Sequence, residues 1–83
     1  MKIKRKELRN LIKRSKGRFF TVVFIKKEGD ERRMTCKLLE NQDFKGNYLK
    51  VSDMALPKGN IRTINLETTK SLNINKMKYK VEG

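Results

Sequence analysis

Short apolar segments separated by turn residues constrain the fold of this chain more than any other feature of its sequence. After Gly17 these segments are rich in aromatic and β-branched residues, and residues 31–38 alternate polar and apolar side chains, as a half-buried strand does. The predicted strands are residues 18–27, 31–38, 48–54, 61–66 and 71–74. Five short strands spaced about 8–12 residues apart predict a small barrel or sandwich.

The segments between the predicted strands favour turns and loops. They are residues 28–30, 39–47, 56–60 and 67–70, the last as a single helical turn. Residues 75–76 have two interpretations. They form a two-residue turn, or they belong to a strand that continues through residues 77–81, where apolar and basic side chains alternate.

The order of the predicted elements is helix, long hairpin, strand, tight turn, strand, single turn and strand. Small SH3-like and Sm-like barrels have this order, and closing the sheet removes the exposed edges that favour aggregation. An OB-fold is the competing five-stranded barrel, but no helical pattern lies between the third and fourth strands. We therefore expect a mainly β protein: a five-stranded SH3-like or Sm-like barrel over residues 18–83, preceded by a basic N-terminal helix or arm over residues 1–17.

Positive charge is concentrated at the amino end. The whole chain has 22 Lys and Arg against 9 Asp and Glu, a net charge of +13, and residues 1–18 hold nine of the cations and one acid. This segment has a helical period, with Ile3, Leu8, Leu11 and Ile12 near one face, and it predicts a helix over about residues 4–15. The alternative is a solvated basic arm, because like charges four residues apart, such as Arg5 and Arg9, repel each other.

Composition excludes several kinds of chemistry. The chain has no His, which excludes His-based acid–base pairs and His-ligated metals, and its one Cys excludes an intrachain disulfide. Cys36 alternates with Met34 and Leu38, which predicts a small core residue rather than a reactive thiol. Asp43 and Asp53 lie ten residues apart without a metal motif. We therefore expect neither an enzyme nor a metal or cofactor site.

The sequence also bears on location. No apolar run is long enough to span a membrane, and no apolar signal core follows the basic first residues. A lone thiol without a disulfide framework fits a reducing compartment. We expect a cytoplasmic protein without membrane attachment.

The clustered cations predict a surface that binds the phosphates of nucleic acid, with the amino-terminal segment lying along the backbone. The predicted contact residues are Lys4, Arg5, Lys6, Arg9, Lys13, Arg14, Lys16, Arg18, Arg32, Arg33, Lys37, Lys58 and Arg62. A different class of function also fits the charge. The chain is then a module that binds an acidic protein surface, and basic patches steer such encounters too.

Aromatic residues are few. Phe19, Phe20 and Phe24 lie in the most apolar predicted strand, which predicts core positions. The candidates for stacking on bases are Phe44, Tyr48 and Tyr79, with packing at the rim of the core as the alternative. With no Trp and no DNA-reading motif, backbone and shape contacts are favoured over base reading.

Three pieces of the sequence resemble a known family. They are residues 16–24 running into 27–30, residues 33–38, and residues 58–67. This stretch resembles a WYL-like family of phage and bacterial proteins with an Sm-like, SH3-type barrel. The chain departs from the family pattern in a shorter loop at residues 40–47 and a more basic amino end. The resemblance implies the barrel fold, and it implies a phage-encoded protein linked to nucleic-acid binding or ligand sensing.

The last of these pieces singles out Arg62. Its guanidinium can hold a phosphate or carboxylate through a bidentate fork. The alternative is a salt bridge to Glu67 or Asp53 that stabilises the barrel.

The resemblance gives the protein-binding alternative a concrete form, in which a phage module inhibits or redirects a host protein complex. A ring built by pairing of edge strands is a third interpretation. The sequence leaves open the oligomeric state and the choice between DNA and RNA, or between single and double strands.

Overall fold

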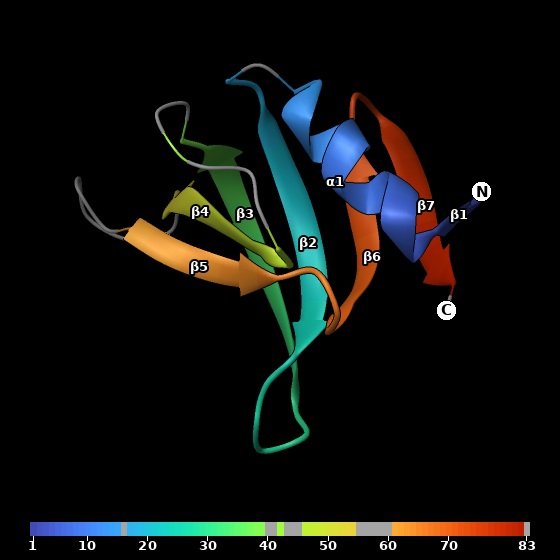
Figure 1. The fold of residues 1–83 in the computed structure, drawn as a ribbon, viewed down its shortest axis with the longest axis vertical. Coiled ribbons are helices and arrows are strands. Elements are labelled where there is room, and N and C mark those ends of the chain that lie inside the picture. The colour runs from blue at the N-terminus through green and yellow to red at the C-terminus, as the bar shows by residue number, and fades with distance from the viewer. Residues whose placement is uncertain (16, 40–41, 43–45, 55–60, 83) are drawn as a thin grey trace.

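A computed structural model describes residues 1–15, 17–39, 42, 46–54 and 61–82. In chain order these residues form β1 (Lys2–Lys4), α1 (Arg5–Lys13), β2 (Phe19–Ile25), β3 (Glu31–Leu38), β4 (Tyr48–Asp53), β5 (Ile61–Asn65), β6 (Thr69–Ile74) and β7 (Met77–Glu82) (Figure 1). The protein is mainly β with one short helix among the described residues, as the sequence predicted. The two predicted strands with the clearest patterns, residues 18–27 and 31–38, correspond to β2 and β3.

The strands form a single sheet with the order β1-β7-β6-β2-β3-β4-β5. β1 runs parallel to β7, and all other neighbours are antiparallel. This corrects the prediction of a five-stranded barrel, because the sheet has seven strands within the described residues and is not closed. The two additional strands come from the chain ends. Lys2–Lys4 joins the edge of the sheet beside Met77–Glu82 instead of remaining a free arm.

The short link between β5 and β6 makes the sheet curl. In a flat sheet four strand spacings would separate these two strands by about 19 Å. The chain from Asn65 to Thr69 spans at most about 14 Å. Asn65 also holds the turn: its Oδ1 accepts from the N–H of Glu67 at 2.9 Å, and its carbonyl accepts from the Thr69 hydroxyl at 2.9 Å. β5 therefore lies across the sheet rather than flat at its edge (Figure 1).

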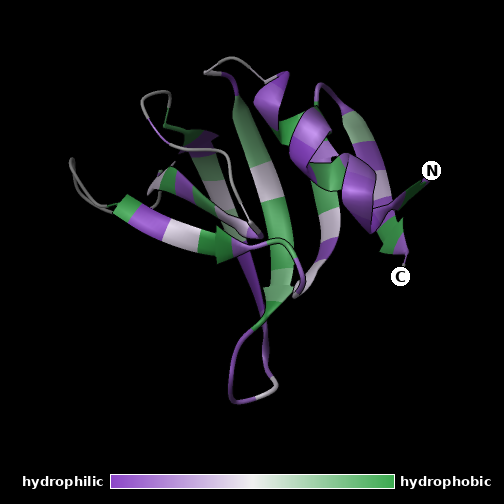
Figure 2. Ribbon diagram, viewed as in Figure 1, coloured by the Kyte–Doolittle hydropathy of each residue, from purple (hydrophilic) through white to green (hydrophobic). Residues whose placement is uncertain are grey.

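The helix α1 is part of the hydrophobic core. Leu8 and Ile12, one turn apart, are both fully buried, and α1 packs against β1 and β7. Arg5 fastens the start of the helix, because its Nη1 donates to the carbonyls of Leu66 and Thr69. Of the two sequence interpretations, the structure therefore has the helix rather than the solvated arm. Figure 2 shows that α1 carries hydrophilic and hydrophobic residues on different sides, while β2 is hydrophobic along most of its length.

The turn between β6 and β7 consists of two residues, Asn75 and Lys76, which confirms the first interpretation of this segment. Both have positive φ, at 51° and 62°. Two-residue hairpins with positive φ at both positions match the twist of the strands, and Asn followed by Gly is the preferred pair. Lys76 occupies the position where Gly is favoured.

We predict that Lys76→Gly raises the free energy of unfolding by about 0.5–1 kcal/mol, because a side chain at positive φ costs more than the extra chain entropy of Gly. Urea unfolding followed by circular dichroism measures the change. The matched control is Lys80→Gly within β7, where the same substitution should destabilise the protein by a similar amount. A loss of stability in Lys76→Gly would contradict the prediction.

Candidate nucleic-acid interface

The two faces of the sheet differ in what covers them. The inner face carries the buried side chains of β2, β3 and β6, and α1 lies over it. Directly paired residues of neighbouring strands lie on the same face, so the strand register defines the opposite side. We call this side the outer face; in β1 to β4, β6 and β7 it is formed by Lys2, Lys4, Phe19, Thr21, Val23, Ile25, Glu31, Arg33, Thr35, Lys37, Tyr48, Lys50, Ser52, Ser71, Asn73, Lys78, Lys80 and Glu82.

The outer face is strongly cationic. Among the described residues of β1, β2, β3, β4, β6 and β7, it carries seven Lys and Arg side chains and two acids, Glu31 and Glu82. Glu82 forms an ion pair with Lys2 and Glu31 forms one with Lys70, each at 3.5 Å. The seven cations are Lys2, Lys4, Arg33, Lys37, Lys50, Lys78 and Lys80, all of them exposed. Strand alternation therefore collects positive charge from four different strands onto one surface.

A shallow hollow of about 120 Å³ lies at the centre of the outer face. It is lined by Thr21, Val23, Arg33, Ser71, Asn73 and Lys78. Arg33 on β3 and Lys78 on β7 flank a floor of short side chains on β2 and β6. Two cations with hydroxyl and amide groups between them make a suitable environment for a phosphate group.

Phe19 is an exposed aromatic residue on the outer face, which corrects the prediction that it belongs to the core. Its exposed fraction is 59%, whereas Phe20 is buried and Phe24 is half-buried against the core. Phe19 pairs with Lys37 across β2 and β3. Two consecutive Phe residues in a strand point to opposite faces, so only one of them can reach the core.

Six of the predicted cations fall into two groups on opposite sides of the molecule. Lys4, Arg33 and Lys37 lie on the outer face. Because α1 covers the inner face, the solvent-exposed cations of the helix lie on the other side, and they are Lys6, Lys13 and Arg14. The helix and the outer face therefore do not form one continuous surface.

Two predicted contact residues of the helix are only half-exposed. Arg5 is occupied by the carbonyls of Leu66 and Thr69, which gives it a structural role. Arg9 lies beside it and lines a hollow of about 350 Å³ with Lys6 and Glu67. Arg18, before β2, is exposed and donates through Nη1 to Asn75 Oδ1 at 3.1 Å. Lys16, Lys58 and Phe44 lie outside the described residues.

Arg32 and Arg62 come together away from the outer face. They line a hollow of about 210 Å³ with Lys26, Phe24, Met34 and Thr63. Within the described part of the chain, Arg62 makes neither of the predicted ion pairs, with Glu67 or Asp53. Glu67 instead accepts from Asn47 Nδ2 at 2.6 Å. Three cations therefore share this hollow, and one of them is the arginine that the family resemblance singled out.

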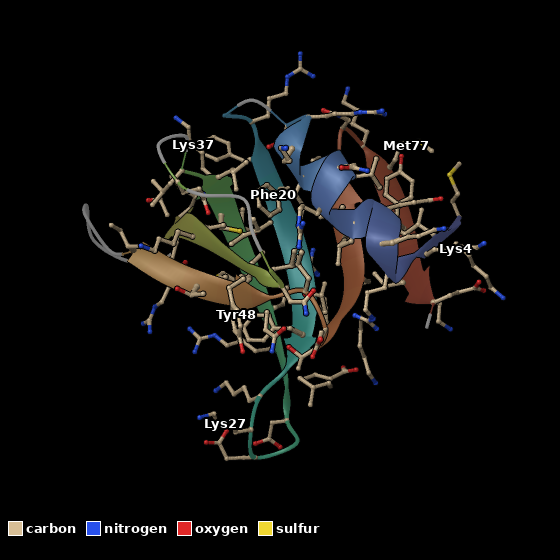
Figure 3. The ribbon with its side chains drawn as sticks, viewed as in Figure 1. Lys4, Phe20, Lys27, Lys37, Tyr48 and Met77 are labelled. Carbon is tan, nitrogen blue, oxygen red and sulfur yellow. The ribbon has the colours of Figure 1, made fainter. Side chains whose placement is uncertain are left out.

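The two other aromatic candidates within the described residues differ in exposure. Tyr48 is exposed, at 61%, at the start of β4, opposite Asn65 of β5. Tyr79 is half-buried and packs against the core, which is the alternative that the sequence left open for it. Figure 3 shows Tyr48 apart from Lys37, which pairs with Ser52 near the other end of β4.

Sequence reasoning missed Lys2, Lys50, Lys78 and Lys80, and it misplaced Phe19. A signal for two of the lysines was present, because residues 77–81 alternate apolar and basic side chains and so place Lys78 and Lys80 on one face. The pattern does not reveal which face α1 covers. For this reason the outer face could not be assembled from the sequence.

Cys36 is a buried core residue, as predicted. It pairs with Asp53 across β3 and β4, and both side chains are buried. Burial, and secondly the negative charge of Asp53, raise the pKa of the Cys36 thiol from 9.0 to about 12. In the regions that the structure describes, no three Cys, Asp or Glu side chains gather as metal ligands would.

We predict that Cys36 of the folded protein resists thiol reagents at pH 8, because a pKa of about 12 leaves about one thiol in ten thousand ionised. Labelling with an aromatic disulfide should be fast only in denaturant. Folding raises this pKa, so ionisation of Cys36 should not change stability below pH 9 and should lower it between pH 9 and pH 12. Cys36→Ala should lack that part of the pH dependence. Native labelling as fast as in denaturant would contradict the prediction.

Comparisons with protein-family models, with curated proteins and with solved structures find no match to this chain. In the part of the chain that the structure describes, α1 is too short and too polar to cross a membrane.

Proposed function

We propose that this chain is a nucleic-acid-binding accessory protein that holds the phosphate backbone on its outer face. The observation that carries the proposal is the gathering of seven exposed cations and only two acids, within the described residues, on a sheet face that α1 leaves uncovered. We assign the chain a binding role without catalysis or a cofactor.

Counterion release supplies the driving force in this proposal. A nucleic acid carries a dense line of phosphates with condensed counterions, and each phosphate that a Lys or Arg neutralises releases them. The logarithm of affinity then falls linearly with the logarithm of salt concentration, by about 0.9 per phosphate on a duplex and about 0.7 on a single strand. Arg33 and Lys78, on either side of the central hollow, are the pair that should contribute most directly.

The cations of α1 have a secondary part in this proposal. They raise the positive potential around the molecule and so increase the rate of encounter with a polyanion. They lie on the side of the molecule opposite the outer face, and they do not contact a strand bound there. Deleting residues 1–16 is a poor test of their role, because Ile3, Leu8 and Ile12 belong to the core.

The proposal includes the fold relationship that the sequence resembles. We propose that β2 to β6 correspond to an Sm-like, SH3-type unit, with β1 and β7 added beyond β6. The succession of helix, hairpin, strand, strand, short turn and strand supports this correspondence. A phage origin and a location in the host cytoplasm belong to the same proposal.

A second candidate function is binding to a host protein, and one observation favours it. Three large apolar side chains are exposed on β4, just after it and on β5: Tyr48, Met54 and Ile61, at 61%, 45% and 62%. β5 is also an edge of the sheet, and an edge strand offers unpaired backbone groups to another chain. A stoichiometric protein partner that survives nuclease and moderate salt would favour this function over the first.

We predict that the protein binds short oligonucleotides at roughly 50 mM salt and that Arg33→Gln/Lys78→Gln lowers the salt slope by about 1.4–1.8, as expected for two lost phosphate contacts. Fluorescence anisotropy with labelled single-stranded and duplex 20-mers, measured over a salt series, gives both the affinity and the slope.

The matched control is Lys6→Gln/Lys27→Gln. It removes the same charge from α1 and from the tip of the β2–β3 hairpin, where Figure 3 shows Lys27 far from Lys37. The control should lower affinity slightly and leave the slope nearly unchanged. The absence of any binding at roughly 50 mM salt, or an equal loss of slope in both double variants, would refute the proposal.

A further inference from the structure

We propose that the outer face takes a single strand of nucleic acid rather than a duplex, and that one unpaired base stacks on Phe19. This inference rests on the proposed function and deepens it by naming the form of the ligand. Its first basis is that cations on two strands of the outer face flank two strands with uncharged side chains; we call the former the walls and the latter the floor. Its second basis is an exposed aromatic ring at one end of the floor.

The strand register defines the walls and the floor. One wall is on β3 and the other on β7, and β6 and β2 lie between them. Arg33, Val23, Ser71 and Lys80 form one row across the four strands, and Thr35, Thr21, Asn73 and Lys78 form the next row. Each of these rows has at least one cation at its edge and short side chains in the middle. The Thr21 and Thr35 hydroxyls share a hydrogen bond of 2.9 Å, which fixes the floor on the β3 side.

The dimensions of the floor suit a single strand. Three strand spacings separate the walls by about 14 Å, and the floor from Val23 to Phe19 extends about 13 Å along β2. At about 3.4 Å per stacked nucleotide, this length accommodates about four nucleotides. Phosphates near either wall then lie within reach of Lys and Arg side chains, while the bases lie over the short residues of the floor.

The curvature of the sheet disfavours a duplex. The sheet curls around the inner face and α1, so its outer face is convex, and the molecule measures 32 × 30 × 26 Å. A duplex is stiff over about 150 base pairs and would touch such a surface along one line, close to one wall only. A single strand bends freely and can follow the floor between both walls.

Phe19 supplies the second argument against a duplex. A ring stacks well only on a base that is not already stacked and paired within a helix. Phe19 stands at the end of the floor, next to Thr21 on the same face of β2 and opposite Lys37. A cation beside an exposed ring places a phosphate contact within one nucleotide of the stacked base. Tyr48 is equally exposed and shares the outer face with Lys50, but it stands on β4, outside the wall on β3, opposite Asn65 of β5.

The experiment compares a 12-nucleotide single strand with its duplex, using dT12, rU12 and the dT12·dA12 duplex, for the intact protein and three variants. Phe19→Ala should weaken single-strand binding by about 5- to 100-fold, the usual effect of removing one stacking ring, and leave duplex binding unchanged. Phe19→Trp should restore or strengthen single-strand binding. Tyr48→Ala, the matched control, should bind like the intact protein.

Stacking has its own spectroscopic readout. A strand with 2-aminopurine within a dT12 sequence should show quenched fluorescence on binding to the intact protein and not to Phe19→Ala. Because the Phe19 and Tyr48 side chains are both largely exposed, circular dichroism should show that Phe19→Ala, Phe19→Trp and Tyr48→Ala keep the fold.

The outcomes separate the two proposals. If no oligonucleotide binds, the proposed function fails and this inference fails with it. If the duplex binds as tightly as the single strand and Phe19→Ala has no effect, only this inference is overturned. If Tyr48→Ala loses as much affinity as Phe19→Ala, the strand lies elsewhere and the placement on the floor is wrong. The arms with dT12 and rU12 distinguish DNA from RNA.

Discussion

The packing of Leu8 and Ile12 against the inner face of the sheet is the interaction on which the other features depend. These two side chains are fully buried, and they join α1 to the same core as Val22 and Leu72. A sheet in a small protein needs cover on one face only, because its strands alternate apolar and polar side chains. By covering the inner face, α1 determines that the other face meets solvent and any ligand.

This packing also separates the positive charge into two regions. The exposed cations Lys6 and Lys13 of α1 lie on the side away from the sheet, whereas the lysines of β1 and β7 and Arg33 and Lys37 of β3 lie on the outer face. Nothing in the amino-terminal sequence distinguishes an arginine that binds phosphate from one that caps backbone carbonyls. Arg5 has the same local sequence context as its basic neighbours, yet it donates to the carbonyls of Leu66 and Thr69, more than sixty residues away.

Local patterns predicted the elements of this fold, and contacts between distant segments decided the rest. The alternation of residues 31–38 placed Met34, Cys36 and Leu38 inside, where the structure has them. β1 was not predictable in this way, because three residues show no period and their partner strand lies nearly eighty residues further along the chain. The same limit applies to Phe19: an apolar run such as residues 19–25 does not show which of two adjacent rings faces the core.

The charge on the outer face would link folding to the proposed binding. Seven cations on one face repel one another, and this repulsion lowers the stability of the compact chain. A protein of this size has a free energy of unfolding on the order of 5 kcal/mol. Because this total is small, electrostatic repulsion among the cations matters to it. A polyanion that binds only the folded state removes the repulsion, and at a hundred times its dissociation constant it adds about 2.7 kcal/mol. The arrangement of charge that weakens the isolated domain is therefore the same arrangement that would make a bound nucleic-acid strand stabilising.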